Sequence, residues 1–356
     1  MAFSLSKLAQ NLLKRTNGDR SSTSARTTTL VTGSVAVGAL VTGAVLEKTR
    51  RNRLPRPDQL PKALEADVQE IEIMEGRVRY YKRGGNGVPI VLLHSVNAAA
   101  SSFEMKPIFE HLKAHTDRPL YALDLLGFGL SDRPAARYSP GLYQRELRRF
   151  LSERVMEAAD VIALSLSCEY AATVANAFPF LVNRMVFISP TGLGAHPQES
   201  VLQRAVVGAA STVGAFEIFF ARLTQRSSLR SFYAEHVFLK PDHVPSALVD
   251  YAYVTSHAKG AHYAPRRFIQ GVLSMHGYAP PVYAGIRQPT LFVIPQADSE
   301  MVQDFVRAPV IAAENEAYIQ LRHVDAGLLP QWEAPEALFE VIDPFIGVAE
   351  QLTVSS

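Results

Sequence analysis

The sequence predicts an α/β protein in which helices flank a mostly parallel sheet. Short, entirely apolar runs recur along the chain, and such runs are typical of strands that are buried on both faces. They lie at 90–93, 120–123, 161–164, 185–188 and 291–294. Between most of these runs the apolar residues follow helical spacing. Because strands that alternate with helices form parallel sheets with helices on both faces, the fold class follows from this order.

Two further segments complete the predicted architecture. Residues 68–74 alternate between apolar and polar in their first half, Glu75 and Gly76 form a turn, and 78–82 returns as the second strand of an antiparallel hairpin. Between 191 and 287 no strand pattern occurs, and the chain is helical in character. An insertion of this size between two strands predicts a cap above the carboxyl edge of the sheet, where open α/β sheets bind ligands. The core is therefore expected at 66–190 and 288–350.

Composition excludes several classes of protein. The chain has 356 residues, of which 47% are hydrophobic and 20% charged, so it can bury a sizeable core. Cys168 is the single cysteine, which excludes an internal disulfide framework, and no spacing typical of zinc ligands occurs. No predicted strand is followed by the glycine pattern of a dinucleotide site. The sequence thus implies neither a metal nor an organic cofactor.

Charge separates the N-terminal part from the rest of the chain. Residues 1–56 contain ten Lys and Arg against two acids, whereas the remainder contains 26 against 32. A basic leader on an acidic body indicates a role of the leader in membrane binding or targeting, and it argues against nucleic-acid binding by the body.

The leader divides into three parts: a basic segment at 1–29, an uncharged segment at Leu30–Leu46 and a basic, proline-containing linker at 47–65. The uncharged segment is at the short end of what spans a bilayer, so we expect a possible transmembrane helix there. The basic cluster that follows it would keep the main domain in the cytoplasm. Alternatives are a cleaved presequence that targets an organelle, and a tail ahead of a helix that docks on the domain.

A candidate nucleophile lies between a predicted strand and a predicted helix. Residues 161–164 form a buried strand, and a sharp turn with serine leads into a helix. A strained turn of this kind exposes a serine hydroxyl above the sheet. We interpret Ser167 as the residue at the apex.

Several ordered motifs resemble the α/β-hydrolase fold superfamily, in particular its capped, esterase- or lipase-like members. Residues 90–95 are similar to its strand followed by His-Gly, 124–132 match its D-x-x-G-x-G-x-S pattern, and 165–169 are similar to its nucleophile elbow. Pro289–Asp298 resembles the strand and loop that carry the acid. The resemblance covers residues 68–348.

The resemblance implies roles for individual residues. Ser167 would be the nucleophile, and Asp298 the acid that orients the catalytic imidazole. The backbone N–H groups of Val96 and Cys168 would form the oxyanion hole.

The histidine of that family is missing from its usual place. Its Gly-His motif aligns with Gly327 and Leu328, so a leucine occupies the position of the base. His323, five residues earlier, is the candidate substitute, and the histidines at 257, 262 and 276 in the cap are further alternatives. The elbow departs as well, because Ser165 and Glu169 stand where the family has glycines, and Ser95 replaces another glycine.

Two functions therefore remain open. One is a serine hydrolase that acts on a small hydrophobic substrate, an ester or lipid, at a membrane. The other is a non-hydrolytic member of the fold: a pseudoenzyme, a ligand-binding protein or an enzyme without a Ser-His-Asp triad.

Overall fold

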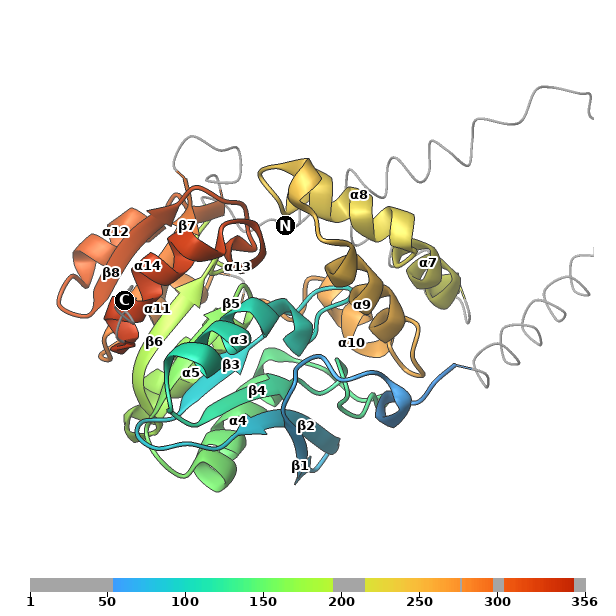
Figure 1. The fold of residues 1–356 in the computed structure, drawn as a ribbon, viewed down its shortest axis with the longest axis horizontal. Helices are drawn as coiled ribbons and strands as arrows, with labels where there is room; N and C mark the ends of the chain where they lie inside the picture. Colours follow the sequence, from blue (N-terminus) through green and yellow to red (C-terminus); the bar gives the residue numbers. More distant parts are fainter. Residues whose placement is uncertain (1–53, 195–214, 276, 297–303, 349–356) are drawn as a thin grey trace, which may run out of the picture.

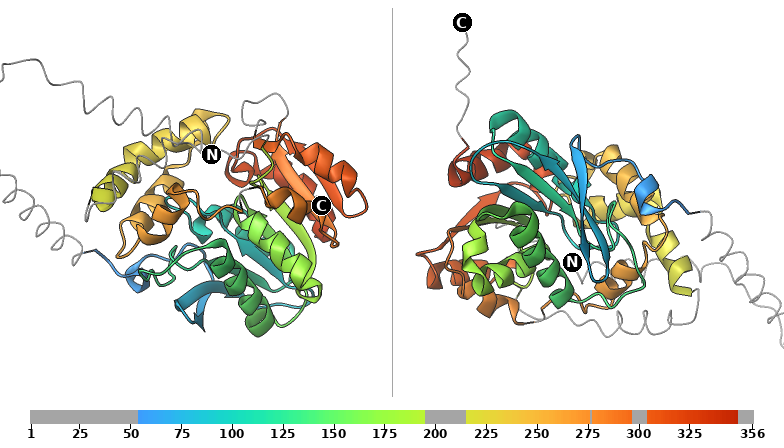
Figure 2. Two further views of the ribbon diagram at one scale, coloured as in Figure 1. Left: turned by 180° about the vertical axis from the view of Figure 1, so that it is seen from behind. Right: turned by 90° about the horizontal axis from the view of Figure 1, so that it is seen from below.

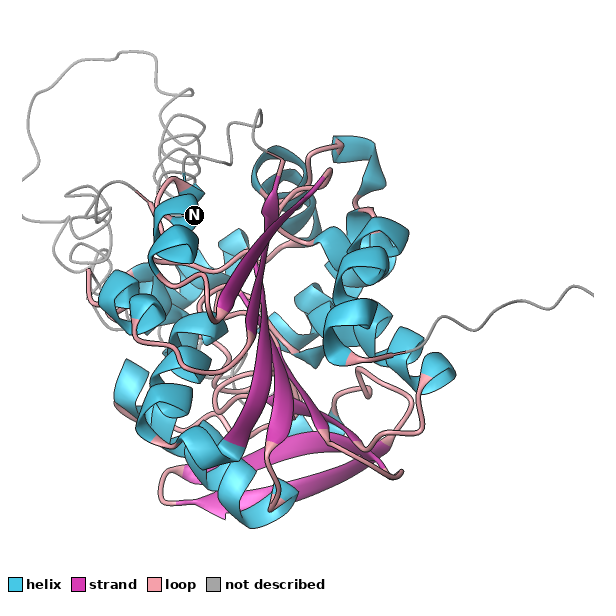
Figure 3. Cartoon of the chain, turned by 90° about the vertical axis from the view of Figure 1, so that its left-hand side faces the viewer, coloured by secondary structure: helices cyan, strands magenta, loops and turns pink. Residues whose placement is uncertain are grey.

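An eight-stranded sheet with helices on both sides forms the centre of the molecule (Figures 1 and 3). The computed structural model describes residues 54–194, 215–275, 277–296 and 304–348. The strand order is β1-β2-β4-β3-β5-β6-β7-β8. The strands are β1 (Asp67–Ile73), β2 (Gly76–Arg83), β3 (Ile90–Leu93), β4 (Leu120–Asp124), β5 (Ala159–Leu164), β6 (Val182–Ile188), β7 (Thr290–Pro295) and β8 (Ile319–Val324).

The predicted fold class is confirmed. The hairpin β1–β2 is antiparallel and pairs antiparallel with β4, and the neighbouring strands from β4 to β8 are parallel. Every residue of β3, β4, β5 and β7 is buried, as the apolar runs require when helices cover both faces.

Helices of the core cover the two faces of the sheet. Figure 3 shows the sheet nearly edge-on, with helices on both sides. They are α3 (Lys106–His115), α4 (Pro140–Phe150), α5 (Ser167–Ala177), α11 (Ala279–Ala284), α12 (Ala308–Glu314), α13 (Pro330–Glu333) and α14 (Pro335–Ile346). Helix α4 begins after Ser139, because the Ser139 side chain accepts a hydrogen bond from Leu142 N and Pro140 occupies the first helical position. A π-helical turn, Leu151–Val155, follows α4 directly.

The cap consists of four described helices, α7 (Ala215–Leu223), α8 (Arg226–His236), α9 (Ser246–Ser256) and α10 (Tyr263–Ile269). Figures 1 and 2 show them gathered on one side of the molecule. Arg133, in the loop that follows β4, donates to Thr255 O at 2.7 Å, and Tyr170 in α5 donates to Leu273 O at 2.7 Å. The last part of the expected cap segment behaves differently, since Asn176 of α5 donates to Val282 O and α11 packs on the core.

The residues before β1 do not form a separate linker in the described part. Lys259 N donates to Pro55 O at 2.8 Å, and the Tyr251 hydroxyl donates to Pro61 O at 2.8 Å. A short 3-10 helix, Pro57–Gln59, lies between these two contacts. We call residues 54–61 the N-terminal strap, because they join the cap to the first strand.

The predicted segment Leu30–Leu46 lies outside the described residues. Within the described ranges, no helix combines the length and the apolar character needed to cross a membrane.

Candidate active site

The turn between β5 and α5 has its apex at Ser165. Strand β5 ends at Leu164 and α5 begins at Ser167, so only two residues make the turn. Ser165 has φ +57°, in the left-handed region that costs a non-glycine residue about 1–2 kcal/mol. Its N–H donates to Ile188 O at 2.9 Å, and its carbonyl accepts from Cys168 N at 3.1 Å. These two bonds fix the strained residue between β6 and α5.

The placement of Ser167 at the apex is corrected by this geometry. Ser167 is the first residue of α5 and is 1% exposed, and its hydroxyl donates to His94 O at 2.5 Å. The sequence did contain a signal for the right position. The Gly-x-Ser-x-Gly pattern fits with Ser165 at its centre, because Ala163 and Ser167, both small, then take the glycine positions.

The Ser165 hydroxyl does not hold the described fold together through a hydrogen bond. The residue is 4% exposed, and Oγ forms no hydrogen bond with any of the described residues. Ser189, at the end of the neighbouring strand β6, shares these properties: it has φ +48°, and its buried Oγ lacks a partner in the same part of the chain. Two unused hydroxyls therefore follow adjacent strands at the carboxyl edge of the sheet.

The predicted oxyanion donors differ in their availability. Cys168 N is committed to Ser165 O, so it belongs to the turn itself. Backbone N–H groups of Leu166, next to Ser165, and of Val96 make no hydrogen bond within the described ranges. Both remain available to an oxygen of a bound molecule.

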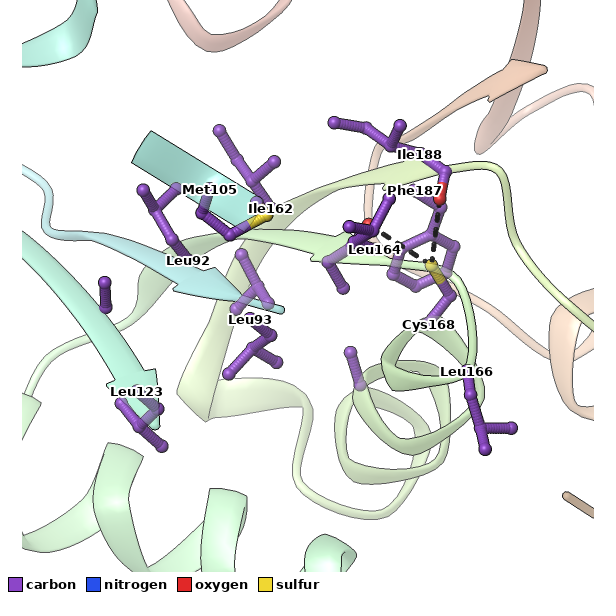
Figure 4. Packing of buried hydrophobic residues seen from close by; sticks show 14 of the residues in the cluster. Leu92, Leu93, Met105, Leu123, Ile162, Leu164, Leu166, Cys168, Phe187 and Ile188 are labelled. Atoms are coloured by element: carbon purple, nitrogen blue, oxygen red, sulfur yellow. Dashed lines mark hydrogen bonds between the residues drawn. The ribbon is translucent and has the colours of Figure 1, made fainter. Parts of the chain in front are cut away.

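The Cys168 side chain packs inward. Its Sγ lies 3.2 Å from Ala163 O and 3.9 Å from Ile188 O. Figure 4 shows the Cys168 side chain among buried hydrophobic residues, next to Phe187 and Ile188. Burial raises the pKa of this thiol well above its usual value, so the side chain stays a neutral packing group.

A buried carboxylate holds the loop that contains Val96. Glu104 accepts from Ser95 N at 2.9 Å, from Ser95 Oγ at 3.0 Å and from Asn97 Nδ2 at 2.9 Å. Burial is the main cause that raises the pKa of Glu104. The serine that replaces the glycine of the family at position 95 thus supplies two of the donors to this carboxyl.

His94 is a structural residue. Its Nδ1 donates to Ser95 O at 2.5 Å, and its Nε2 accepts from Leu125 N at 3.0 Å. Burial lowers the pKa of the imidazole, which keeps it neutral. Both ring nitrogens are committed, and His94 is therefore not placed to take a proton from Ser165.

His323 lies far from the Ser165 turn. It sits on β8, is exposed, and donates from Nδ1 to Pro295 O at 3.0 Å. Strand β8 is three strands away from β5, which corresponds to about 14 Å at the spacing of neighbouring strands. The structure does not bring this histidine to either serine.

Leu328 is buried, and its backbone N–H donates to Val237 O in the cap at 2.7 Å. Asp298 and His276 lie outside the described residues. His257 donates from Nδ1 to Tyr253 O at 2.8 Å, and His262 Nε2 lies 3.5 Å from Glu217 Oε1, so both take part in contacts within the cap.

Glu169, which does not fit the glycine pattern when Ser167 is centred, has a structural role. It is fully buried in α5 and accepts from Thr191 Oγ1 at 2.5 Å and from Met275 N at 2.8 Å. These bonds tie the first turn of α5 to the segments that enter and leave the cap. Among the described residues, no group of His, Cys, Asp and Glu side chains has the arrangement of a metal site.

The family model described as "Alpha/beta hydrolase family" matches residues 90–341. The chain belongs to this family. The match includes the Ser165 turn, the segment around Leu328 and the whole cap.

Curated relatives and solved structures extend the comparison. An uncharacterised protein of Mycobacterium tuberculosis is 29% identical over 148 residues, covering 42% of this chain and 41% of the relative. The protein named 1-acylglycerol-3-phosphate O-acyltransferase ABHD5, of Rattus norvegicus, is 27% identical over 122 residues, covering 33% of this chain and 34% of the relative. The chain thus spans less than half the length of these curated relatives.

A crystal structure of a probable hydrolytic enzyme from Pseudomonas aeruginosa superposes with a TM-score of 0.63. The two sequences are 16% identical, and the match covers 84% of this chain and 99% of that one. At this identity the likeness concerns the fold.

Proposed function

We propose that the protein is a serine hydrolase of the α/β-hydrolase family, with Ser165 as nucleophile and an ester or lipid-like small hydrophobic molecule as substrate. The observation that carries the proposal is the strained turn: Ser165 holds φ +57°, and its hydroxyl is uncommitted in the described part. Strain of this kind persists at sites where function requires it. A serine with a purely structural role would gain from relaxing or from a hydrogen bond.

The surroundings of Ser165 support acyl transfer. The hydroxyl precedes the N-terminus of α5, whose dipole favours developing negative charge. Leu166 N and Val96 N are the two backbone donors for an oxyanion, and the Glu104 network holds the loop of Val96 in place. Leu166 replaces Cys168 in this role, because Cys168 N is used within the turn.

The substrate class rests on the leader and on one relative. An enzyme with an apolar leader meets hydrophobic substrates at a bilayer. The rat relative is named as an acyltransferase that acts on an acylglycerol phosphate. Acyl esters are therefore the compounds to test first.

A second candidate function is a non-hydrolytic role, as a pseudoenzyme, as a ligand-binding protein or as an enzyme without a triad. Leu328 favours it, since a leucine occupies the place of the family's histidine. A serine hydroxyl needs a base within hydrogen-bond reach to react at neutral pH. Neither His94 nor His323 provides one.

Labelling with a fluorophosphonate separates the two functions. The full chain is treated with the probe, and the labelled residue is identified by mass spectrometry, with Ser165→Ala and Ser167→Ala as matched variants. We expect labelling at Ser165 that only Ser165→Ala abolishes. Labelling at Ser167 would restore the assignment based on sequence alone. A folded chain that takes up no label would support the non-hydrolytic function.

We further propose that the protein associates with a membrane through Leu30–Leu46, with the main domain in the cytoplasm; the alternative is a presequence that is cleaved after import into an organelle. Support comes from the uncharged segment and the basic cluster that follows it. Cell fractionation combined with the intact mass of the purified protein distinguishes the two. A full-length chain in the membrane fraction fits the anchor, and a shortened soluble chain fits the presequence.

A further inference from the structure

A pocket lies away from the Ser165 turn, between the cap and the loop that follows β4. Its volume is about 240 Å³, room for about eight water molecules at their volume in the liquid. Its walls come from α7, from the α9–α10 loop, from Arg133 and from Leu54 of the N-terminal strap. No residue of the Ser165 turn contributes to it.

Arg133 brings a buried cation to this pocket. The side chain is buried, with 8% of the residue exposed, and its two Nη atoms donate to Thr255 O at 2.7 Å and Gly129 O at 2.6 Å. Its Nε is buried without a hydrogen-bond partner, and the guanidinium forms no ion pair with a carboxylate of the described residues. Burial lowers the pKa of Arg133 to about 10, so the group is still charged at neutral pH. The charge of Asp124 raises the pKa of Arg133 against the effect of burial, but a buried cation without a direct ion pair is still costly for the fold.

The remaining walls contain one lysine and one glutamate, and they hold Arg133 in place. Lys259 lines the pocket, and so do His257 and His262; Glu217 is the acidic residue among the lining side chains and lies 3.5 Å from His262. Gly260 has φ +79°, and a Cβ there would lie 2.5 Å from Arg133 O. The α9–α10 loop therefore packs directly against Arg133, and the pocket has a preformed wall.

We propose that this pocket binds a small oxyanion of the phosphate class, either a free phosphate compound or the phosphomonoester head group of a lipid. An anion between Arg133 and Lys259 would give the buried guanidinium the direct ion pair that it lacks among the described residues. Phosphate suits the site because it offers several acceptor oxygens to donors that approach from different segments. The apolar side chains at the rim, Leu54, Phe220 and Ala221, leave space for the group that carries the phosphate.

The test uses the full chain and isothermal titration with inorganic phosphate, followed by soluble dihexanoyl phosphatidic acid and, as a comparison, dihexanoyl phosphatidylcholine. Lys259→Gln removes a charge from the wall, and Ala221→Trp fills the pocket without changing charge. Lys240→Gln, at an exposed lysine outside the pocket, is the matched control. Thermal unfolding shows that each variant is folded.

We expect saturable binding of phosphate that Ala221→Trp abolishes, that Lys259→Gln weakens at least about threefold and that Lys240→Gln leaves unchanged. Binding of the phosphatidic acid as well identifies a lipid head group as the ligand, and binding of phosphate alone identifies a free phosphate compound. The proposal is overturned if neither compound binds, or if Ala221→Trp binds as well as the wild type. Because no residue is shared with the Ser165 turn, the outcome is independent of the labelling experiment.

Discussion

At the scale of the single residue, the conformation of Ser165 that suits a nucleophile lowers the stability of the fold. Its left-handed backbone costs about 1–2 kcal/mol, and no hydrogen bond of its side chain to the described residues offsets that cost. Ser167 shows the opposite balance, with a helical backbone and a hydroxyl bonded to His94 O. The two serines, two residues apart, should therefore respond in opposite directions to the same substitution.

We predict that Ser165→Gly raises the free energy of unfolding by about 0.5 kcal/mol, because relief of the strain exceeds the backbone entropy that glycine adds to the unfolded chain. Ser167→Gly should lower it by about 1 kcal/mol through loss of the bond to His94 O. Urea denaturation measures both.

Met156→Gly is the control for this pair, since Met156 has φ +63° at an exposed position at the end of the π-helical turn, before β5 begins. It should show a gain similar to that of Ser165→Gly. A loss of stability in Ser165→Gly together with a gain in Met156→Gly would mean that the Ser165 side chain makes a stabilising contact, and would weaken its assignment as an uncommitted nucleophile.

Hydrophobicity alone could locate this turn but not its apex, which only the small residues Ala163 and Ser167 on either side of Ser165 indicate. Leu164 and Leu166 are both apolar, so hydrophobicity continues across the boundary between strand and helix. The boundary is decided by the backbone bonds of Ser165 to Ile188 and Cys168, and one of these depends on a strand that is distant in sequence. The position of Leu328 in its motif, by contrast, could be recognised directly, because that motif is local.

At the scale of elements, helix α4 is joined to the loop after β4 by a buried acid. Glu146 is 2% exposed and accepts from Leu126 N with both carboxyl oxygens, at 3.1 and 3.3 Å. Burial raises the pKa of Glu146 to about 8, against a usual value of 4.5. At neutral pH the folded protein therefore keeps this carboxyl protonated, whereas the unfolded chain ionises it.

The sign of the pH dependence follows from this difference. Between the unfolded pKa of 4.5 and the folded pKa of about 8, the native state binds one proton more than the unfolded state, so Glu146 makes stability fall as the pH rises. Its contribution to the slope is at most about 1.4 kcal/mol per pH unit, and it levels off above about pH 8.

We predict that Glu146→Gln, which keeps an acceptor for Leu126 N, removes this part of the slope. Urea denaturation at a series of pH values from 5 to 9 gives the comparison with the wild type. Equal slopes in the two proteins would show that Glu146 is ionised in the folded state.

Elements with local patterns were predictable, and element boundaries that depend on distant contacts were not. Apolar runs located β3 to β7, because strands buried on both faces consist mainly of apolar residues. Helix α11 belongs to the segment predicted as the cap, and it contacts helices of the core. Its hydrogen bond from Asn176 to Val282 O, which places it on the core, leaves no periodic signal.

At the scale of the whole molecule, the N-terminal strap joins the leader to the cap. The sequence predicts an extended linker here, because it is rich in basic residues and proline. The contacts that hold the strap use the carbonyls of Pro55 and Pro61, and backbone acceptors are present in every sequence. The attachment of the strap to the cap therefore could not be predicted from the types of residue in the strap. The stability of a shortened chain should therefore depend on whether the truncation ends before Leu54 or also removes the strap.

We predict that a chain that begins at Leu54 unfolds at the same temperature as the full protein, whereas a chain that begins at Lys62 is less stable by about 2 kcal/mol. The shorter chain loses two hydrogen bonds, worth about 1 kcal/mol each, to the cap at Lys259 and Tyr251. It also loses the Leu54 wall of the phosphate pocket, so binding of phosphate should weaken in parallel.

Thermal unfolding and limited proteolysis of the α9–α10 loop measure the effect, with the longer chain as control. If the two shortened chains are equally stable and equally resistant to protease, the strap does not stabilise the cap. Binding of a partner by the leader would then not affect the cap through these residues.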